Sequence, residues 1–164
     1  MKENKKKRSN SDEHNYLVTS ALPYANGPIH IGHLAGAYLP ADEYVRYLRA
    51  KGEDVLFVCG TDEHGTPIEM KAHEENKEPK EVVDKFHKQI KETFNKVNMS
   101  FDIFSRTTED IHYETSQDFF SKLKNQGLMD KRKSIQLYCE NDEMFLPDRY
   151  VNGTCPYCGA EDQR

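Results

Sequence analysis

The segment that most constrains the fold is residues 54–59 (DVLFVC), a nearly continuous apolar run typical of a strand buried on both faces. A β-prone run at 16–21 precedes it, and a helical pattern from about 33 to 51 lies between them. Gly52 follows that pattern as a helix-ending residue, and Pro40 inside it predicts a kink or a late helix start. Strand, helix and strand in this order predict a βαβ unit with parallel strands.

Two more helices and a third strand extend this unit. Apolar residues recur at helical spacing between 82 and 97, residues 101–104 (FDIF) resemble a strand, and Thr107 or Thr108 is expected to cap a last helix that ends before Gly127. The side chains that we expect these helices to bury are Val82, Val83, Phe86, Ile90, Phe94, Val97, Phe119, Phe120 and Leu123. The predicted fold class is α/β, the first half of a Rossmann-like, doubly wound parallel sheet.

Composition excludes several classes of protein. The net charge of −5 argues against a general polyanion binder, and no run approaches the ~18 apolar residues of a membrane span. The amino terminus has lysines but no apolar stretch after them, so we expect no secretory signal. Four cysteines are too few for a disulfide scaffold, which favours a cytoplasmic location.

The apolar content of 36% is low for a self-sufficient domain. Half of a doubly wound sheet would expose an edge strand and a face, through which the chain could associate with another protein. A compact, self-contained small domain is the alternative.

Residues 21–33 (ALPYANGPIHIGH) connect the first strand to the first helix, at the edge of the sheet where ligands of such folds bind. A helix start offers N–H groups to phosphate, and His30 and His33 can add donors aimed at phosphate oxygens. Donors placed for the charge of the transition state lower the barrier to reaction. Gly32 leaves room for a flat base. Taken alone, two histidines at a helix start are more often surface or core residues, and a pair at this spacing could also bind zinc with further ligands nearby.

Three segments resemble one family. Residues 23–33 (PYANGPIHIGH) resemble the "HIGH" signature of class I aminoacyl-tRNA synthetases, in the form that methionyl-tRNA synthetases carry. Residues 59–68 (CGTDEHGTPI) are similar to the block after the second strand of the methionyl enzymes. Residues 145–151 (FLPDRYV) and 153–159 (GTCPYCG) are similar to the entry into the zinc knuckle of that family.

The resemblance implies an enzyme that activates methionine with ATP and Mg²⁺, forming methionyl-adenylate and pyrophosphate, and then transfers methionine to tRNA(Met). It implies that His30 and His33 are catalytic, stabilising the transition state of attack at the α-phosphorus. The ATP-binding residues that it implies are Asn26, His30, Gly32 and His33.

The resemblance implies methionine binding by Leu22, Tyr24 and Asp62, with the Asp62 carboxylate on the α-ammonium. Leucine and tyrosine suit a thioether, because apolar and aromatic faces both contact sulfur well. From position alone, Asp62 could instead cap a helix and Tyr24 could be a core aromatic. Glu63 and His64 receive no catalytic role.

The resemblance divides the chain into three parts. Residues 1–15, with five Lys or Arg and three Asp or Glu, are expected to be a disordered tail. Residues 16–128 are the first half of the Rossmann-like catalytic domain, and residues 129–164 are the incomplete start of a connective insertion with the zinc knuckle. The Lys-Met-Ser-Lys-Ser loop of the family's second half does not occur in the sequence. We therefore expect a fragment, a truncated gene product or one piece of a split protein, inactive alone; a non-catalytic binding module is the alternative.

The cysteines are the candidate ligands for a metal ion. The resemblance assigns Cys155 and Cys158 to Zn²⁺, and the family would complete the site with a further cysteine pair downstream. Cys59 is expected to pack as a small hydrophobe, and Cys139 to be structural. With two of four ligands, the monomer is expected to retain little zinc unless two chains pair their knuckles.

Overall fold

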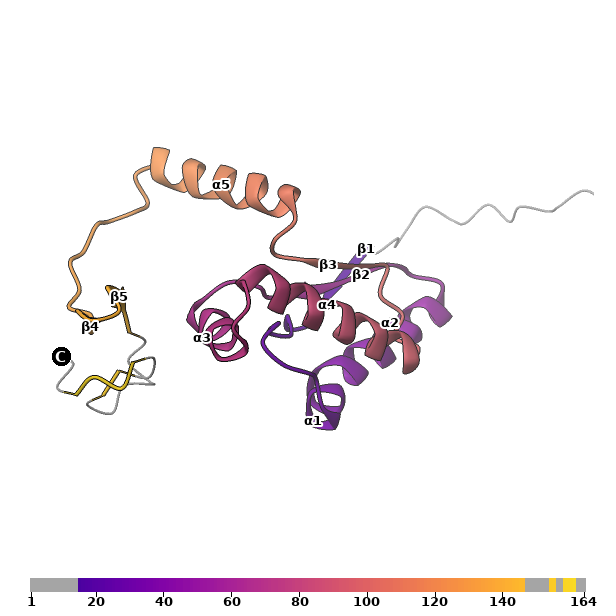
Figure 1. The fold of residues 1–164 in the computed structure, drawn as a ribbon. Helices are drawn as coiled ribbons and strands as arrows, with labels where there is room; N and C mark the ends of the chain where they lie inside the picture. Colours follow the sequence, from indigo (N-terminus) through magenta and orange to yellow (C-terminus); the bar gives the residue numbers. More distant parts are fainter. Residues whose placement is uncertain (1–14, 147–153, 156–157, 162–164) are drawn as a thin grey trace, which may run out of the picture. The chain divides into compact units, whose positions relative to one another are not determined.

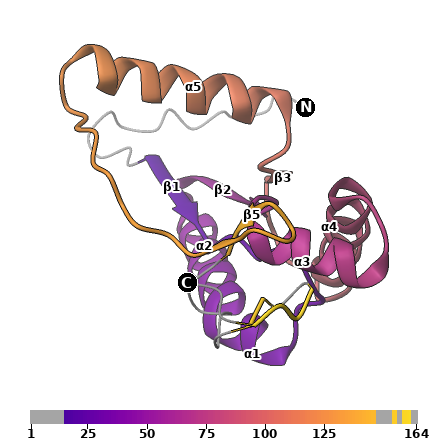
Figure 2. The same ribbon diagram turned by 60° about the vertical axis from the view of Figure 1, so that its left-hand side comes forward.

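The computed structural model describes residues 15–146, 154–155 and 158–161, which divide into two compact units. Residues 15–63 and 83–107 form the first unit, and residues 64–82 together with the described residues from 108 onward form the second. Most of the predicted tail, residues 1–14, lies outside the described residues. Each unit is followed separately in Figures 1 and 2.

The first unit contains a parallel sheet of three strands, β1 (Asn15–Thr19), β2 (Asp54–Thr61) and β3 (Ile103–Arg106), in the order β1-β2-β3. The α/β class and the parallel sheet are therefore confirmed. In central β2, Phe57, Cys59, Gly60 and Thr61 are buried and Val58 is half-buried, whereas Leu56 is 45% exposed. The predicted burial on both faces therefore holds only for part of this strand. β1 lies at an edge, and its Leu17 is largely exposed.

The β1–β2 connection is a loop as far as His30 and is helical from Ile31 to Lys51. The helical part consists of α1 (Ile31–His33), a π-helical turn η1 (Leu34–Tyr38) and α2 (Leu39–Lys51). Pro40 lies in the first turn of α2, where a proline is tolerated, and the π-helical turn η1 directly precedes this helix. The predicted kink or late start at Pro40 is thus realised as an irregular helical turn before α2. Gly52 ends α2 in the left-handed conformation, with φ of 84°.

The β2–β3 connection holds two helices, α3 (Thr66–Glu75), which was not expected, and α4 (Pro79–Lys96). The prediction for α4 is confirmed at five positions, since the buried side chains include Val82, Val83, Phe86, Ile90 and Phe94. It is wrong at Val97, which is 41% exposed because the helix ends at Lys96. Within the first unit, Phe94 packs edge-on against Tyr38 of η1 and Phe104 of β3, with ring centroids 4.7 and 5.3 Å apart.

The second unit contains α3, α5 (Asp110–Asn125) and a short antiparallel hairpin of β4 (Tyr138–Cys139) and β5 (Met144–Phe145). Residues 134–139 (SIQLYC) alternate in the sequence as a half-exposed strand would, but only the last two of them form a strand. No helix among the described residues has the length and apolar character needed to cross a membrane.

Two predictions for α5 are wrong. Phe119, Phe120 and Leu123 are 64%, 54% and 42% exposed, because no described element covers the apolar face of this helix. The helix begins at Asp110 after Glu109, and neither predicted threonine caps it. Thr107 is buried instead, and its hydroxyl oxygen accepts a hydrogen bond from the Glu63 N–H at 2.9 Å.

Candidate active site

The loop after β1 is joined to the end of β2. Asp62 donates its backbone N–H to the Pro23 carbonyl at 2.9 Å, and the Ala25 N–H donates to the Asp62 carbonyl at 2.8 Å. These bonds pair Tyr24 with Asp62 in a parallel bridge beyond the regular strands. The bridge brings together two of the predicted methionine-binding residues at the carboxyl edge of the sheet.

Asp62 does not cap the helix that follows it, and Tyr24 is not a core aromatic. α3 begins at Thr66 with Gly65 at its N-cap, so Asp62 does not cap it. Tyr24 is half-buried rather than a core residue, and Leu22 is 50% exposed. Asn26 lies half-buried in the same loop. The side chains predicted to bind ligands are thus accessible from this edge of the first unit.

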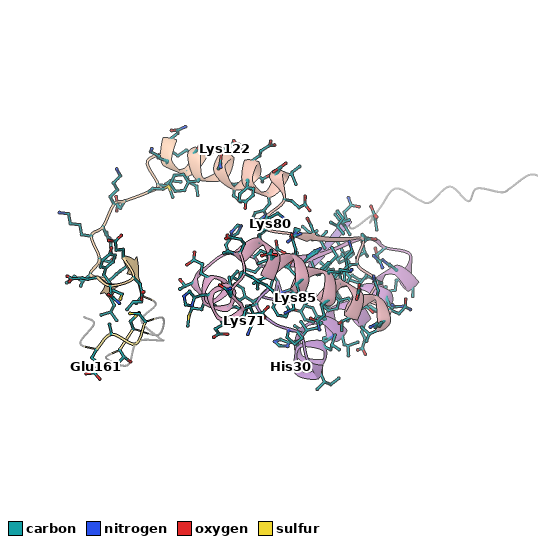
Figure 3. All side chains as sticks on the ribbon, viewed as in Figure 1. His30, Lys71, Lys80, Lys85, Lys122 and Glu161 are labelled. Atoms are coloured by element: carbon teal, nitrogen blue, oxygen red, sulfur yellow. The ribbon has the colours of Figure 1, made fainter. Side chains whose placement is uncertain are left out.

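The two histidines hold each other in place at the start of α1 (Figure 3, where His30 is labelled). The His30 N–H donates to Nδ1 of His33 at 3.1 Å, and the Gly32 N–H donates to Nδ1 of His30 at 3.1 Å. Their rings lie with centroids 3.8 Å apart, and both side chains are exposed. The sequence interpretation did not include this mutual capping.

The capping determines what each imidazole can do. A ring nitrogen that accepts an N–H bond carries no proton, so each neutral ring carries its proton on Nε2. The N–H groups of His30 and Gly32 already bond to the imidazoles, and the two side chains can therefore offer their Nε2–H groups as donors to a ligand. A Cβ at Gly32 would lie 2.9 Å from Cε1 of His30, so a larger residue there would displace the His30 ring from its capping position.

A second cluster of chemical groups lies in the hairpin unit. Cys139, Asp142, Cys155 and Cys158 each offer a ligand atom, and these atoms all lie within 4.8 Å of one another. The β4–β5 hairpin holds Cys139 and Asp142, while Gly159, with φ of 72°, closes the turn after Cys158. The structure thus places two further candidate ligands, Cys139 and Asp142, beside the cysteine pair that the sequence assigned to the metal.

Several of the distances in this cluster are close to those of a tetrahedral metal site. Zn–S bonds of ~2.3 Å at tetrahedral angles place two sulfurs about 3.8 Å apart. The Sγ atoms of Cys139 and Cys158 are separated by 3.7 Å. Oδ2 of Asp142 lies 3.5 Å from the Cys139 sulfur and 3.1 Å from that of Cys155. Three thiols and one carboxylate are a donor set suited to Zn²⁺.

Cys59 takes no part in such a site. It is buried at the end of β2 in the first unit, with its sulfur 3.8 Å from the Ala21 carbonyl oxygen. Burial raises the pKa of its thiol to about 11, which keeps it protonated and unreactive. The prediction that Cys59 packs as a small hydrophobe is confirmed.

Comparison with known proteins gives one consistent family. The sequence model of the tRNA synthetases class I (M) matches residues 16–164. Methionine–tRNA ligase of Pyrococcus abyssi is 66% identical over 149 residues, which are 91% of this chain and 21% of the relative. The Thermococcus kodakarensis ligase is 65% identical over 149 residues, again 91% of this chain and 20% of the relative.

A solved structure agrees with these relatives. The crystal structure of Mycobacterium tuberculosis methionyl-tRNA synthetase bound by methionyl-adenylate superposes with a TM-score of 0.71 at 28% sequence identity. The superposed region covers 90% of this chain and 30% of the Mycobacterium tuberculosis chain. The chain spans about a fifth of the length of the curated relatives that it matches.

Proposed function

Because the chain belongs to the class I (M) family of tRNA synthetases, we propose that it forms the first half of a methionine-activating site. In that site, ATP and methionine give methionyl-adenylate and pyrophosphate, and the methionyl group then passes to tRNA(Met). The observation that carries the proposal is the bridge between Tyr24 and Asp62, which joins the histidine-bearing loop to the end of β2.

The reaction needs charge stabilisation more than covalent chemistry. The methionine carboxylate attacks the α-phosphorus of ATP, and negative charge is spread over the phosphate oxygens as pyrophosphate leaves. The Nε2–H groups of His30 and His33 would donate to those oxygens, and Mg²⁺ carried with ATP would neutralise further charge. Asn26 and Gly32 would lie on the nucleotide side.

The amino-acid side of the site rests on the loop and on β2. The Asp62 carboxylate would pair with the methionine ammonium, because a charge-assisted hydrogen bond in a partly desolvated site is strong. Leu22 and Tyr24 would contact the thioether side chain. The Cys139, Asp142, Cys155 and Cys158 cluster would hold one Zn²⁺ ion in a structural site, with no role in the chemistry.

The activity is tested in a full-length chimera, in which residues 16–164 replace the matching segment of the Pyrococcus abyssi relative. We expect it to catalyse ATP–pyrophosphate exchange that depends on methionine and not on leucine, isoleucine or valine. Exchange that is absent, or equal for all four amino acids, would contradict the proposal and favour a binding module of the same fold.

Replacing Asp62 with asparagine in the chimera should weaken methionine binding far more than ATP binding. The amide has nearly the shape of the carboxylate but cannot neutralise an ammonium, and such charged hydrogen bonds contribute ~1.5–3 kcal/mol, about ten- to a hundredfold in affinity. Separate titrations with methionine and with ATP decide the matter. Equal losses for both ligands would show that Asp62 has only a structural role.

The 164-residue chain by itself is not expected to catalyse methionine-dependent pyrophosphate exchange. The lysine-bearing loop that the family uses for the departing pyrophosphate does not occur in this sequence, and positioning and charge stabilisation are nearly all of the chemistry. The control is the same chain carrying His30→Ala and His33→Ala. Exchange clearly above that control would contradict the prediction and would indicate that two chains complete one site.

We also propose that the chain acts in the cytoplasm. We further propose that another chain could associate with the sheet at β1, which is an edge strand with Leu17 exposed. Analytical ultracentrifugation of the chain and of a Leu17→Lys variant tests the second point. A mass that is monomeric and identical for both would exclude association through this edge.

A further inference from the structure

We propose that Glu63 and Arg106 are positioning residues for methionine binding: together they form a buried brace that fixes Asp62 at the carboxyl edge of the sheet. The inference rests on the proposed function and extends it to two residues that the sequence interpretation left without a role. Neither residue would touch the substrate. All of the groups concerned belong to the first unit.

The side chain of Glu63 is fully buried, and both of its oxygens accept hydrogen bonds. Oε2 accepts from Nε of Arg106 at 2.7 Å, and Oε1 accepts from the Thr61 hydroxyl at 2.6 Å. Arg106 also pairs through Nη2 with Asp84 of α4 at 2.6 Å. With its oxygens occupied in this way, Glu63 is not a second carboxylate for a substrate ammonium.

The backbone contacts explain why this network bears on Asp62. On one side of Asp62, the Thr61 carbonyl accepts from the Thr107 N–H at 3.0 Å. On the other side, the Glu63 N–H donates to the Thr107 hydroxyl at 2.9 Å. Asp62 is therefore held between two residues that are tied to the end of β3, while its own backbone groups bond to Pro23 and Ala25 of the ligand loop.

The ion pair between Glu63 and Arg106 would determine how rigidly the backbone on both sides of Asp62 is held. A buried ion pair is rarely the most stable solution for a core, and apolar residues of similar volume often fold as well. Apolar residues would not direct the chain on both sides of Asp62 through hydrogen bonds. A displacement of about 1 Å in a binding group can lower the rate about 10²-fold. Because the displaced group here would be Asp62, the loss would fall on the use of methionine and not on that of ATP.

Glu63→Gln in the full-length chimera provides the test. The amide keeps the size of the side chain but removes its charge, so Arg106 loses one anionic partner and the brace loosens. We expect the KM for methionine to rise about tenfold, a change worth ~1.4 kcal/mol, with the KM for ATP unchanged. Arg106→Lys, which cannot reproduce the planar fork, should raise the methionine KM in the same direction.

Asp42→Asn is the matched control. Asp42 is also buried, and it accepts from Nε of Arg46 at 2.6 Å and from the Ser100 N–H at 2.7 Å. Ser100 lies just before β3, at the amino end of the sheet and away from the ligand loop. This variant should lower the unfolding temperature as Glu63→Gln does, but leave the KM for methionine unchanged.

A second measurement does not depend on catalysis. Amide hydrogen exchange in the chimera should be faster at Asp62 and Ala25 in Glu63→Gln and not in Asp42→Asn. The Glu63 network is attached to the residues on both sides of Asp62, whereas Asp42 is attached to Ser100. An unchanged methionine KM, a parallel rise for ATP, or unchanged exchange at these amides would overturn the inference. A parent chimera without methionine-dependent exchange would contradict the proposed function instead, and the amide measurement would still decide for or against the brace.

Discussion

Replacing His33 with alanine in the full-length chimera is expected to slow adenylate formation by ~10²–10³-fold, while ATP binding in the ground state changes little. Loss of one preorganised donor to a transition-state oxyanion typically has an effect of this size. The same substitution also removes the acceptor for the His30 N–H, so His30 loses its support. His30→Ala should have an effect of similar size.

The mutual capping allows the two roles of His33 to be separated. Asparagine places an oxygen near the position of Nδ1 and can accept the His30 N–H, but it has no donor at the position of Nε2. Glutamine places an amide N–H near Nε2 and cannot cap in the same way. If donation to phosphate is the main role, His33→Gln should be more active than His33→Asn.

Pre-steady-state measurement of adenylate formation, together with equilibrium binding of ATP, distinguishes the outcomes. An unchanged rate with a weaker ATP affinity would contradict the transition-state role. A fully active His33→Asn variant would show that His33 acts only as a cap for the loop.

Purified chain is expected to hold one tightly bound zinc ion per monomer, and its removal should unfold the β4–β5 hairpin. Apparent binding free energies of structural zinc in small knuckles are ~10–16 kcal/mol near neutral pH, so metal binding and local folding are one equilibrium. The first unit has its own sheet and core, and chelation should leave its far-UV circular dichroism signal in place.

Variants of the fourth ligand make this test specific. Asp142→Ala should lose most of the metal, Asp142→Cys should retain it, and Glu140→Ala, a change in the same hairpin outside the cluster, should have no effect. Elemental analysis alongside the mass in solution measures the stoichiometry. Little metal in the monomer, or one zinc ion for each dimer, would support the earlier two-ligand interpretation over the four-residue cluster.

The parts of the fold that could be predicted are those that depend on local patterns. The apolar run in β2 and the helical spacing in α4 each indicate their own structure, and a βαβ order leaves few arrangements of parallel strands. The errors arise where the outcome depends on distant residues. The periodicity of α5 reveals an apolar face but does not show whether another surface covers it. Thr107 stands where a helix cap is expected, but its hydroxyl oxygen accepts a hydrogen bond from the Glu63 N–H instead.

In the candidate site, too, some features follow from local patterns and others depend on distant residues. The loop and Asp62 could be placed at one edge from strand order alone, because the carboxyl ends of parallel strands meet there. The metal cluster could not be predicted in this way, since the β4–β5 hairpin has to fold before Cys139 and Asp142 lie beside Cys155. A signal was nevertheless present: Cys139 and Asp142 have the same spacing as Cys155 and Cys158, and aspartate is an accepted zinc ligand.

A crystal structure of the full-length chimera with a non-hydrolysable methionyl-adenylate analogue tests the central claim most directly. The account predicts that the ammonium group of the analogue lies within hydrogen-bonding distance of the Asp62 carboxylate. It also predicts that Nε2 of His30 and of His33 face the position of the phosphate. An analogue bound away from the junction of the β1 loop and the end of β2, with Asp62 and both histidines free of it, would contradict the account.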